Sequence, residues 1–312
     1  MAHRFALPLL LSIVACVSSA IAAEKRTPAE DPTSGRLLLA TCQFPVSADV
    51  HANAEWIRKQ MRLAAAQEAD LVHFSECALS GYAGVEHESL ADFDWEALRA
   101  ETAAILKLAD ELDQWVVLGS THQLTGEHKP HNSLYVINPQ GEIVDRYDKR
   151  FCTGGDLKHF SPGDHFVVFE VDGVRCGLLI CYDIRFPELY REYQRRGVQL
   201  MLHAFHNAMM KPGVVHPIIM PATGQARAAT NGMFISMNNS CAPEAWPSLL
   251  ISPDGRIVQR LAEHRPGVMV HEIDTNRKYY DASAAYRRRA MDGTLNSGEV
   301  VDDPRSDDRT GY

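Results

Sequence analysis

The chain has 312 residues, of which 46% are hydrophobic and 23% charged. That mixture is typical of a globular enzyme and excludes a collagen, a coiled coil and a disordered chain. Lys and Arg number 31 against 40 Asp and Glu, a formal net charge of −9, which argues against a nucleic-acid-binding protein because such proteins need a concentrated basic face.

The first 23 residues differ in composition from the rest of the chain. A basic start precedes an uncharged run over 5–17, and small residues that include Ala20 and Ala22 follow. This order predicts a secretory signal peptide over 1–23, so we expect an exported protein, periplasmic or secreted. Cys16 ends the sequence Ile-Val-Ala-Cys, which resembles a bacterial lipobox, so a lipoprotein anchored through Cys16 is the alternative.

The remaining chain is expected to form one domain without a membrane span. The apolar run at the start is shorter than the ~20 residues of a spanning helix, and no other segment approaches that length. Residues 24–35, rich in Pro and charge, predict a short disordered lead-in. Because no repeat or break in composition follows, residues 36–291 are expected to be the domain and 292–312 an extended polar tail.

Within the domain, strand and helix patterns alternate early, and hairpins dominate the middle and the end. Apolar runs between turn residues predict strands, and apolar residues at helical spacing predict helices. Strands are expected at 36–44, 71–74, 116–119, 132–138, 142–147, 166–171, 175–180, 199–203, 233–237, 268–273 and on both sides of 252–255; helices are expected at 53–69, 95–115, 187–196 and 217–231. This mixture indicates an α/β protein with helices outside and sheet meeting sheet inside.

Six of the seven cysteines follow the predicted signal peptide, too few for a disulfide scaffold in a chain of this length. No Cys-x-x-Cys sequence is present, so neither a zinc ribbon nor a thioredoxin motif is available. Cys176 and Cys181 should project to opposite faces of a strand and remain unpaired. The other four are expected to be small buried hydrophobic residues: Cys42, Cys77, Cys152 and Cys241.

Cys181 stands between an apolar strand and a segment that begins a helix near Pro187. A cysteine at such a turn exposes its sulfur above the sheet edge. The N–H groups of a nearby helix N-terminus favour a thiolate and can hold an oxyanion. Taken alone, Cys181 is more often a core residue.

Glu76 and Lys149 also lie at strand ends. Glu76 precedes a Gly-Tyr turn, at the carboxyl end of a strand where a carboxylate can line a crevice. Lys149 follows a strand in Tyr147-Asp148-Lys149-Arg150. Each of these residues, taken singly, is more often a solvated surface group.

Three segments in this order closely resemble the nitrilase superfamily of carbon–nitrogen hydrolases. They are Phe-Ser-Glu-x-x-Leu-Ser-Gly-Tyr at 74–82, Tyr-Asp-Lys-Arg at 147–150 and Gly-Leu-Leu-Ile-Cys-Tyr-Asp-Ile-Arg-Phe-Pro-Glu at 177–188. Each segment is weak evidence alone, but the ordered set is specific. The resemblance spans about residues 36 to 280.

The resemblance implies a four-layer α-β-β-α sandwich that associates as a homodimer or higher homo-oligomer. It implies a catalytic triad of Glu76 as general base and acid, Lys149 as oxyanion stabiliser and Cys181 as nucleophile. The backbone N–H of Tyr182 would complete the oxyanion site, and no metal or organic cofactor is required. A Cys thiolate would attack an amide or ureido carbonyl and form a thioester, releasing ammonia or amine.

Two departures from the family pattern refine this expectation. Many members carry a second Glu before the Phe-x-Pro-Gly turn, and the matching residue here is Asp156, to which we assign the same supporting role. The nitrile-cleaving branch usually has Cys-Trp-Glu at the nucleophile, whereas this chain has Cys-Tyr-Asp at 181–183. The resemblance is therefore to amidases and ω-amidases, and we expect hydrolysis of amides rather than of nitriles.

The resemblance implies a small amide or ureido substrate, and its pocket is expected to include His206 and Asn207, which follow the strand at 199–203. A metal site is not expected, because no carboxylate or Cys stands at ligand spacing beside His203 and His206. The alternatives to a hydrolase are a non-catalytic binding protein on the same fold and an acyltransferase that passes the thioester to an amine.

Overall fold

The computed structural model describes residues 35–208, 211, 213–243 and 245–311. The predicted signal peptide, Cys16 and nearly all of the predicted lead-in fall outside the described residues. Two six-stranded sheets form the centre of the described chain.

The first sheet has the strand order β12-β1-β2-β3-β4-β5. Its middle strands β1, β2 and β3 are parallel, and the flanking strands pair antiparallel. The strands are β1 (Arg36–Gln43), β2 (Leu71–His73), β3 (Trp115–His122), β4 (His131–Ile137), β5 (Ile143–Asp148) and β12 (Gly267–Asp274).

The second sheet repeats this plan, with the order β11-β10-β9-β8-β7-β6 and parallel strands β7, β8 and β9 in the middle. The strands are β6 (Val168–Val171), β7 (Val174–Ile180), β8 (Leu200–Ala204), β9 (Phe234–Asn238), β10 (Leu249–Ile251) and β11 (Ile257–Arg260). Because all parallel strands of a sheet end at one edge, side chains that follow them gather there.

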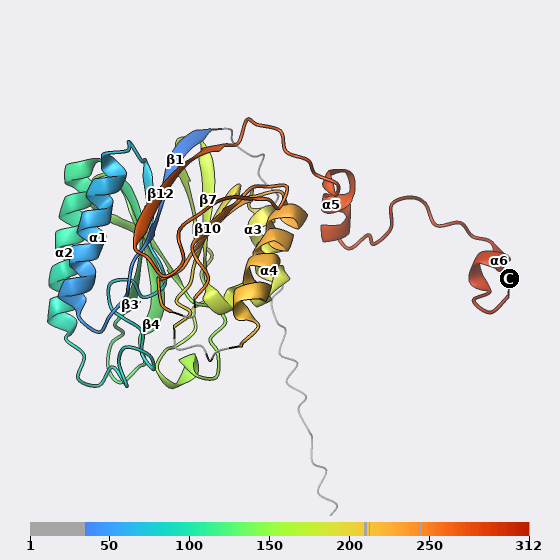
Figure 1. The fold of residues 1–312 in the computed structure, drawn as a ribbon. Helices are drawn as coiled ribbons and strands as arrows, with labels where there is room; N and C mark the ends of the chain where they lie inside the picture. The colour runs from blue at the N-terminus through green and yellow to red at the C-terminus, as the bar shows by residue number, and fades with distance from the viewer. Residues whose placement is uncertain (1–34, 209–210, 212, 244, 312) are drawn as a thin grey trace, which may run out of the picture.

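Helices cover the outer face of each sheet (Figure 1). On one side lie α1 (Val50–Ala65) and α2 (Trp95–Leu112), and on the other lie α3 (Pro187–Arg195) and α4 (His216–Asn231). The predicted four-layer sandwich is therefore confirmed. One apolar core joins the two sheets and also includes buried apolar residues of α3 and α4, and a second packs the first sheet against α1 and α2.

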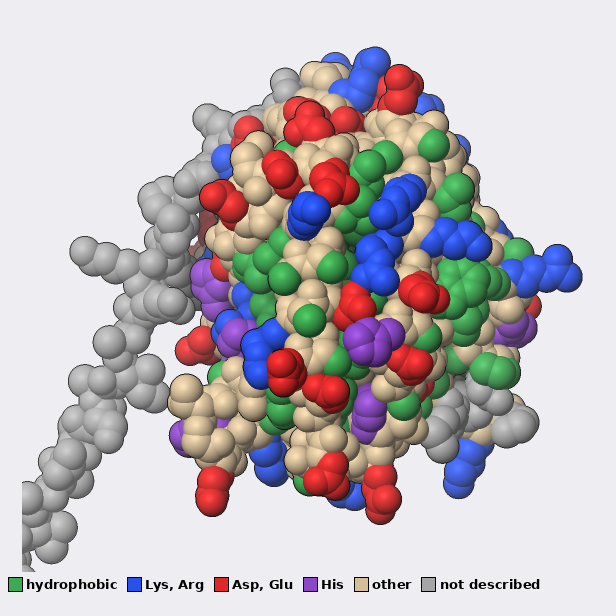
Figure 2. All heavy atoms as spheres, turned by 90° about the vertical axis from the view of Figure 1, so that its left-hand side faces the viewer, with side chains coloured by type: hydrophobic (Ala, Val, Ile, Leu, Met, Phe, Trp, Pro, Cys, Tyr) green, Lys and Arg blue, Asp and Glu red, His purple; other side chains and the backbone are tan. Residues whose placement is uncertain are grey.

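The outer face of α1 and α2 carries acidic and basic side chains side by side (Figure 2). Arg58 pairs with Glu101, and Lys107 lies 3.4 Å from Glu111. Because both signs are interspersed, the net negative charge of the chain does not produce a single-sign patch on this face.

The C-terminal part leaves the sandwich as an extended segment that carries α5 (Ala284–Met291) and α6 (Pro304–Asp307) (Figure 1). Neither helix has a buried residue. All six cysteines in the described chain are free. The expectation of burial was wrong for Cys152, which is half-buried because it lies in the loop after Lys149 rather than in a strand.

Candidate active site

Glu76 lies just after β2, and its side chain is fully buried. Its Oε1 accepts hydrogen bonds from Nδ2 of Asn132 at 2.7 Å and from Nζ of Lys149 at 2.9 Å. Its Oε2 accepts one from the backbone N–H of His206 at 2.9 Å. Both oxygens are thus held by groups from three separate segments of the chain.

The backbone around Glu76 makes a sharp turn and packs closely against the strand β3. Cys77 has a φ of +50°, a left-handed conformation that is rare for residues with a Cβ. Gly119 on β3 lies so close that a Cβ there would be 1.9 Å from the carbonyl oxygen of Ser75. A glycine is therefore required at position 119 for the turn to pack against β3.

Lys149 follows β5, and its side chain is 1% exposed. Besides Glu76, its Nζ contacts Oδ2 of Asp156 at 2.9 Å and the hydroxyl oxygen of Tyr82 at 3.3 Å. Burial alone disfavours the ammonium, but the nearby negative charges of Glu76 and Asp156 outweigh that effect. Together they raise the pKa of Lys149 well above its ordinary value, so Lys149 is a buried cation.

Asp156 begins the short 3-10 helix η1 (Asp156–Lys158) and is 5% exposed. Its Oδ2 also accepts the backbone N–H of Thr153 at 2.8 Å, and its Oδ1 accepts the hydroxyl of Tyr82. Burial raises the pKa of Asp156, but Lys149 and these hydrogen bonds lower it by a larger amount. The net effect is a lowered pKa, so the carboxylate is the stable form. Although Asp is shorter than the expected Glu, Asp156 reaches Lys149 directly.

Cys181 begins the 3-10 helix η2 (Cys181–Arg185) at the end of β7 and has a φ of +42°. Asp183 holds this turn, because its Oδ2 accepts the backbone N–H of Ile180 at 3.0 Å. The same carboxylate accepts the backbone N–H of Phe151 at 2.9 Å and the hydroxyl of Tyr147 at 2.8 Å. Asp183 thereby ties the Cys181 turn to the segment that carries Lys149.

The thiol of Cys181 interacts electrostatically with the side chain of Glu76. Burial raises the pKa of Cys181 well above its ordinary value, and the negative charge of Glu76 raises it further, although Lys149 acts in the opposite direction. The expectation of a low-pKa thiolate was therefore wrong. The resting group is a neutral thiol beside a carboxylate that can accept its proton.

Tyr182 follows the nucleophile in η2, and its side chain is exposed. His206 and Asn207 follow β8, and both are buried. The ring of His206 contacts Oε1 of Glu86 at 2.9 Å and Oγ of Ser240 at 2.8 Å. The structure thus brings all the residues of the predicted site to the carboxyl edges of the two sheets.

Asn207 carries one of several buried side-chain atoms that have no hydrogen-bond partner among the described residues. Its backbone N–H donates to Oδ1 of Asn239 at 3.2 Å, but its buried Oδ1 has no hydrogen-bond partner among the described residues. Because an unsatisfied buried acceptor is costly, this oxygen is free to accept a hydrogen bond from another group.

Sequence reasoning missed three residues that contact the predicted site: Tyr82, Glu86 and Asn132. Tyr82 lies in the Gly-Tyr turn of the first motif, and Asn132 lies at the start of a predicted strand. The motif and the strand pattern therefore include both positions, although neither assigns them a role. Nothing in the sequence pairs Glu86 with His206, because the two residues are 120 positions apart.

His203 and His206, both after the strand β8 begins, contact different partners. The ring of His203 contacts the hydroxyl of Tyr190 at 2.6 Å, whereas His206 contacts Glu86. In the part of the chain that the structure describes, no group of three or more His, Cys, Asp or Glu residues is arranged to hold a metal ion.

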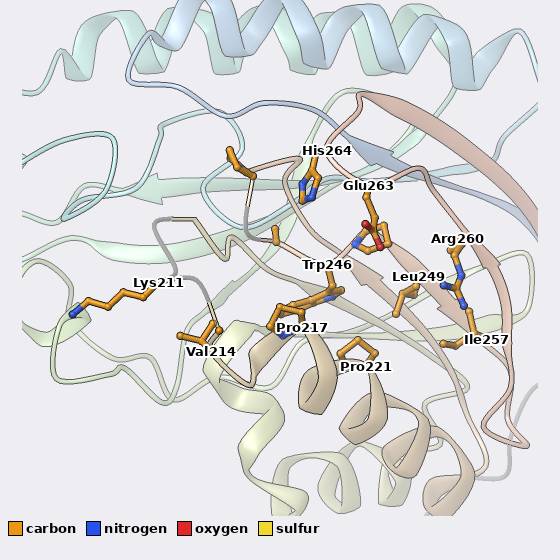
Figure 3. A pocket seen from close by; sticks show the side chains of 14 residues that line it. Lys211, Val214, Pro217, Pro221, Trp246, Leu249, Ile257, Arg260, Glu263 and His264 are labelled. Atoms are coloured by element: carbon orange, nitrogen blue, oxygen red, sulfur yellow. The ribbon is translucent and has the colours of Figure 1, made fainter.

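A hollow of about 400 Å³ lies between the start of α4 and the segment before β10 (Figure 3). Trp246 lines it and also packs against Phe205, with ring centroids 5.2 Å apart. Glu76, Lys149 and Cys181 do not line this hollow. The backbone carbonyl of Phe205 in turn accepts the backbone N–H of Glu76 at 3.3 Å.

The sequence profile described as carbon-nitrogen hydrolase matches residues 38–279. The chain belongs to this family. An (R)-stereoselective amidase of Pseudomonas sp. is 33% identical over 62% of this hydrolase and 69% of its own length. The ω-amidase of Homo sapiens is 27% identical over 76% of this hydrolase and 88% of its own length.

A solved structure gives the same relationship. The amidase of Nesterenkonia sp. AN1 is 25% identical to this hydrolase, with a TM-score of 0.66 over 75% of this chain and 92% of that one. That structure contains acrylamide added to the active-site cysteine of the Nesterenkonia enzyme. The resemblance to the nitrilase superfamily is confirmed. None of the helices in the described ranges combines the length and the apolar character that crossing a membrane requires.

Proposed function

We propose that this hydrolase cleaves a small carboxamide or N-carbamoyl compound through a thioester on Cys181. The observation that carries the proposal is the buried ion pair of Glu76 with Lys149, whose Nζ donates to Oε1 at 2.9 Å, next to the thiol of Cys181, with which Glu76 interacts. A nucleophile, a proton acceptor and a cation are the groups that acyl transfer requires.

In the acylation step, Glu76 takes the proton of the Cys181 thiol as the sulfur attacks the carbonyl carbon of the substrate. Because the pKa of the thiol is raised, proton transfer and attack occur together rather than from a preformed thiolate. Lys149 and the backbone N–H of Tyr182 stabilise the oxyanion. Glu76 then protonates the leaving nitrogen, the carbon–nitrogen bond breaks, and ammonia or an amine departs.

In the hydrolysis step, Glu76 takes a proton from a water molecule, and the water oxygen attacks the thioester carbon. The carbon–sulfur bond breaks, and Glu76 returns the proton to the sulfur, which restores the thiol. Asp156 supports both steps because it keeps the Lys149 ammonium paired. The cycle uses only groups of this chain, the substrate and water.

Amides are favoured over nitriles as substrates. Support comes from the amidase and ω-amidase names of the relatives and from the Cys-Tyr-Asp sequence at the nucleophile. His206 and Asn207 are the proposed pocket residues, and the unpaired Oδ1 of Asn207 suits the N–H of a carboxamide or ureido group.

The test is ammonia release by the purified protein from aliphatic amides, dicarboxylate monoamides, N-carbamoyl amino acids and the matching nitriles. We expect amide or carbamoyl turnover that Cys181→Ala abolishes without a change in the circular dichroism spectrum. Cys152→Ala, which removes the other half-buried thiol, is the matched control and should keep full activity.

Three results would count against this proposal. Full activity of Cys181→Ala would show that Cys181 is not the nucleophile. Faster turnover of nitriles than of amides would place the protein in the nitrile-cleaving branch of the family. Transfer of the acyl group to an added amine in preference to water would make the protein an acyltransferase, and binding without turnover would make it a binding protein.

We propose that the protein is exported, on the basis of the signal-peptide pattern over 1–23. Mass spectrometry of the mature protein from its native host tests this idea. A mature N-terminus at Ala23 or Glu24 supports the signal peptide, whereas an acylated Cys16 supports the lipoprotein alternative. An intact N-terminus on the mature protein would contradict both.

We also propose that the protein forms a homodimer or a higher homo-oligomer. Three apolar side chains at the start of α4 are exposed to solvent, led by Ile218 at 75% exposure: Val215, Ile218 and Ile219. Exposed apolar clusters of this kind mark association surfaces. Light scattering should give at least twice the monomer mass for the wild type and a lower mass for Ile218→Asp; a monomeric wild type would contradict the proposal.

A further inference from the structure

The hydroxyl of Tyr82 contacts two residues of the proposed catalytic site, Lys149 and Asp156. Its hydroxyl donates a hydrogen bond to Oδ1 of Asp156 and accepts one from Nζ of Lys149 at 3.3 Å. Burial raises the pKa of Tyr82 well above its ordinary value, so the hydroxyl keeps its proton and can act as a donor. The phenol oxygen therefore joins the carboxylate of Asp156 to the ammonium of Lys149.

An ammonium group has three N–H donors, and the described residues offer Lys149 three acceptors. These are Oε1 of Glu76 at 2.9 Å, Oδ2 of Asp156 at 2.9 Å and the hydroxyl oxygen of Tyr82 at 3.3 Å. The acceptors differ in what happens to them during the proposed reaction. Glu76 loses its negative charge when it takes the thiol proton, whereas Asp156 and Tyr82 keep their states.

This difference has a consequence for the oxyanion. When Glu76 becomes neutral, its hold on Lys149 weakens, because hydrogen bonds to charged acceptors are the stronger ones. The N–H that pointed at Glu76 can then turn to the oxyanion that forms on the substrate. Asp156 and Tyr82 must keep the ammonium in position at that moment.

The ring of Tyr82 is itself fixed on both sides. It packs edge-on against Phe160 with centroids 5.6 Å apart and lies 5.8 Å from the ring of His206. Its backbone N–H donates to Oε2 of Glu86 at 3.0 Å. The hydroxyl therefore has a defined position beside Lys149. A side chain can align another group only if it is itself held in place.

We infer that Tyr82 is a positioning residue for the proposed reaction, whose hydroxyl acts with Asp156 to hold the Lys149 ammonium while Glu76 is protonated. The inference rests on the proposed function. It also predicts that positions 82 and 156 depend on each other. A longer carboxylate at 156 would press against the Tyr82 hydroxyl, but it could fill the space that the hydroxyl leaves.

The experiment measures kcat and KM for ammonia release by the wild type, Tyr82→Phe, Asp156→Glu and the double variant. Tyr82→Phe removes one oxygen and keeps the ring, so we expect kcat to fall about tenfold with KM changed less than twofold. Asp156→Glu alone should also lower kcat. In the Tyr82→Phe background, Asp156→Glu should raise kcat. Tyr135→Phe is the control, because the hydroxyl of this half-buried residue contacts the ring of His122 at 2.7 Å, away from Lys149 and Asp156.

The rescue separates positioning from a general structural role, since two merely destabilising changes would lower kcat further when combined. Thermal unfolding of all variants checks that each is folded. Wild-type kcat in Tyr82→Phe, or a double variant slower than Tyr82→Phe, would overturn the inference. An active Cys181→Ala protein would instead overturn the proposed function, so the two failures are distinguishable.

Discussion

Two buried carboxylates, one at the end of each sheet, are held in a similar way but have different surroundings. Glu76 accepts hydrogen bonds from Asn132, Lys149 and His206. Asp183 accepts three from Tyr147, Phe151 and Ile180. Only Glu76 has a cation among its donors.

The difference separates the chemistry from the scaffold. Burial raises the pKa of Asp183 to about 6, because its neutral donors compensate only part of the loss of water. Asp183 touches backbone N–H groups on both sides of the site and no reacting atom. Glu76, in contrast, contacts the ammonium directly and interacts electrostatically with the thiol. Buried hydrogen bonds therefore support proton transfer at Glu76 and chain positioning at Asp183.

The largest expected effect follows from removing the charge of Glu76. Glu76→Gln keeps the shape but cannot accept the thiol proton, so we expect kcat for amide hydrolysis to fall about a thousandfold. Steady-state ammonia release measures it. Glu88→Gln, an exposed change nearby, should have no effect. A loss of less than tenfold in Glu76→Gln would assign the proton transfer to another group.

Lys149→Met should cause the next largest loss. It removes an oxyanion donor, which lowers kcat about a hundredfold. It also leaves two buried carboxylates without their cation, so we expect the free energy of unfolding to fall by about 3 kcal/mol. Urea unfolding and kinetics test both parts, with the exposed Lys158→Met as control. An unchanged unfolding free energy would contradict the view that Lys149 compensates Glu76 and Asp156.

Asp183→Asn should have the smallest catalytic effect, within tenfold, because Asp183 exchanges no proton with substrate. Its signature is the pH dependence of stability. The pKa of Asp183 rises from 3.8 to about 6 on folding, so between these values the folded state holds a proton that the unfolded state lacks. This group therefore lowers the free energy of unfolding by about 2 kcal/mol as pH rises from 4 to 6.

Asn cannot titrate, so the variant should lose this decline. The stability difference, Asp183→Asn minus wild type, should become more positive from pH 4 to pH 6, as measured by urea unfolding. The groups that surround Asp183 and also bear on the profile are Lys149, Cys152, Tyr147, Tyr190 and Tyr193. A difference that does not vary with pH would show that Asp183 is already ionised at pH 4.

The elements with an apolar side were predictable from sequence, often to within one or two residues. The strand expected at 175–180 is Val174–Ile180, and the helix expected at 217–231 is His216–Asn231. The helix Ala284–Met291 was missed because it buries no residue and therefore has no apolar periodicity. Apolar periodicity arises where one face of an element is buried, so it cannot predict a helix that buries no residue.

The site was predictable to the extent that short ordered motifs carry it. Glu76, Lys149 and Cys181 each stand in such a motif, and the fold brings the three side chains together. The partners Tyr82 and Glu86 were not predictable, because their contacts with Asp156 and His206 cross 74 and 120 residues. The raised pKa of Cys181 was also missed, because it depends on burial and on Glu76, which the sequence near Cys181 does not contain.

The left-handed backbone at Cys181 implies that activity and folding make opposing demands on one residue. A φ of +42° suits glycine and strains any residue with a Cβ. The sulfur that the reaction needs must be attached to such a Cβ. The most relaxed backbone at this turn therefore belongs to an inactive sequence, and the chain keeps a local conformational strain for as long as it keeps its nucleophile.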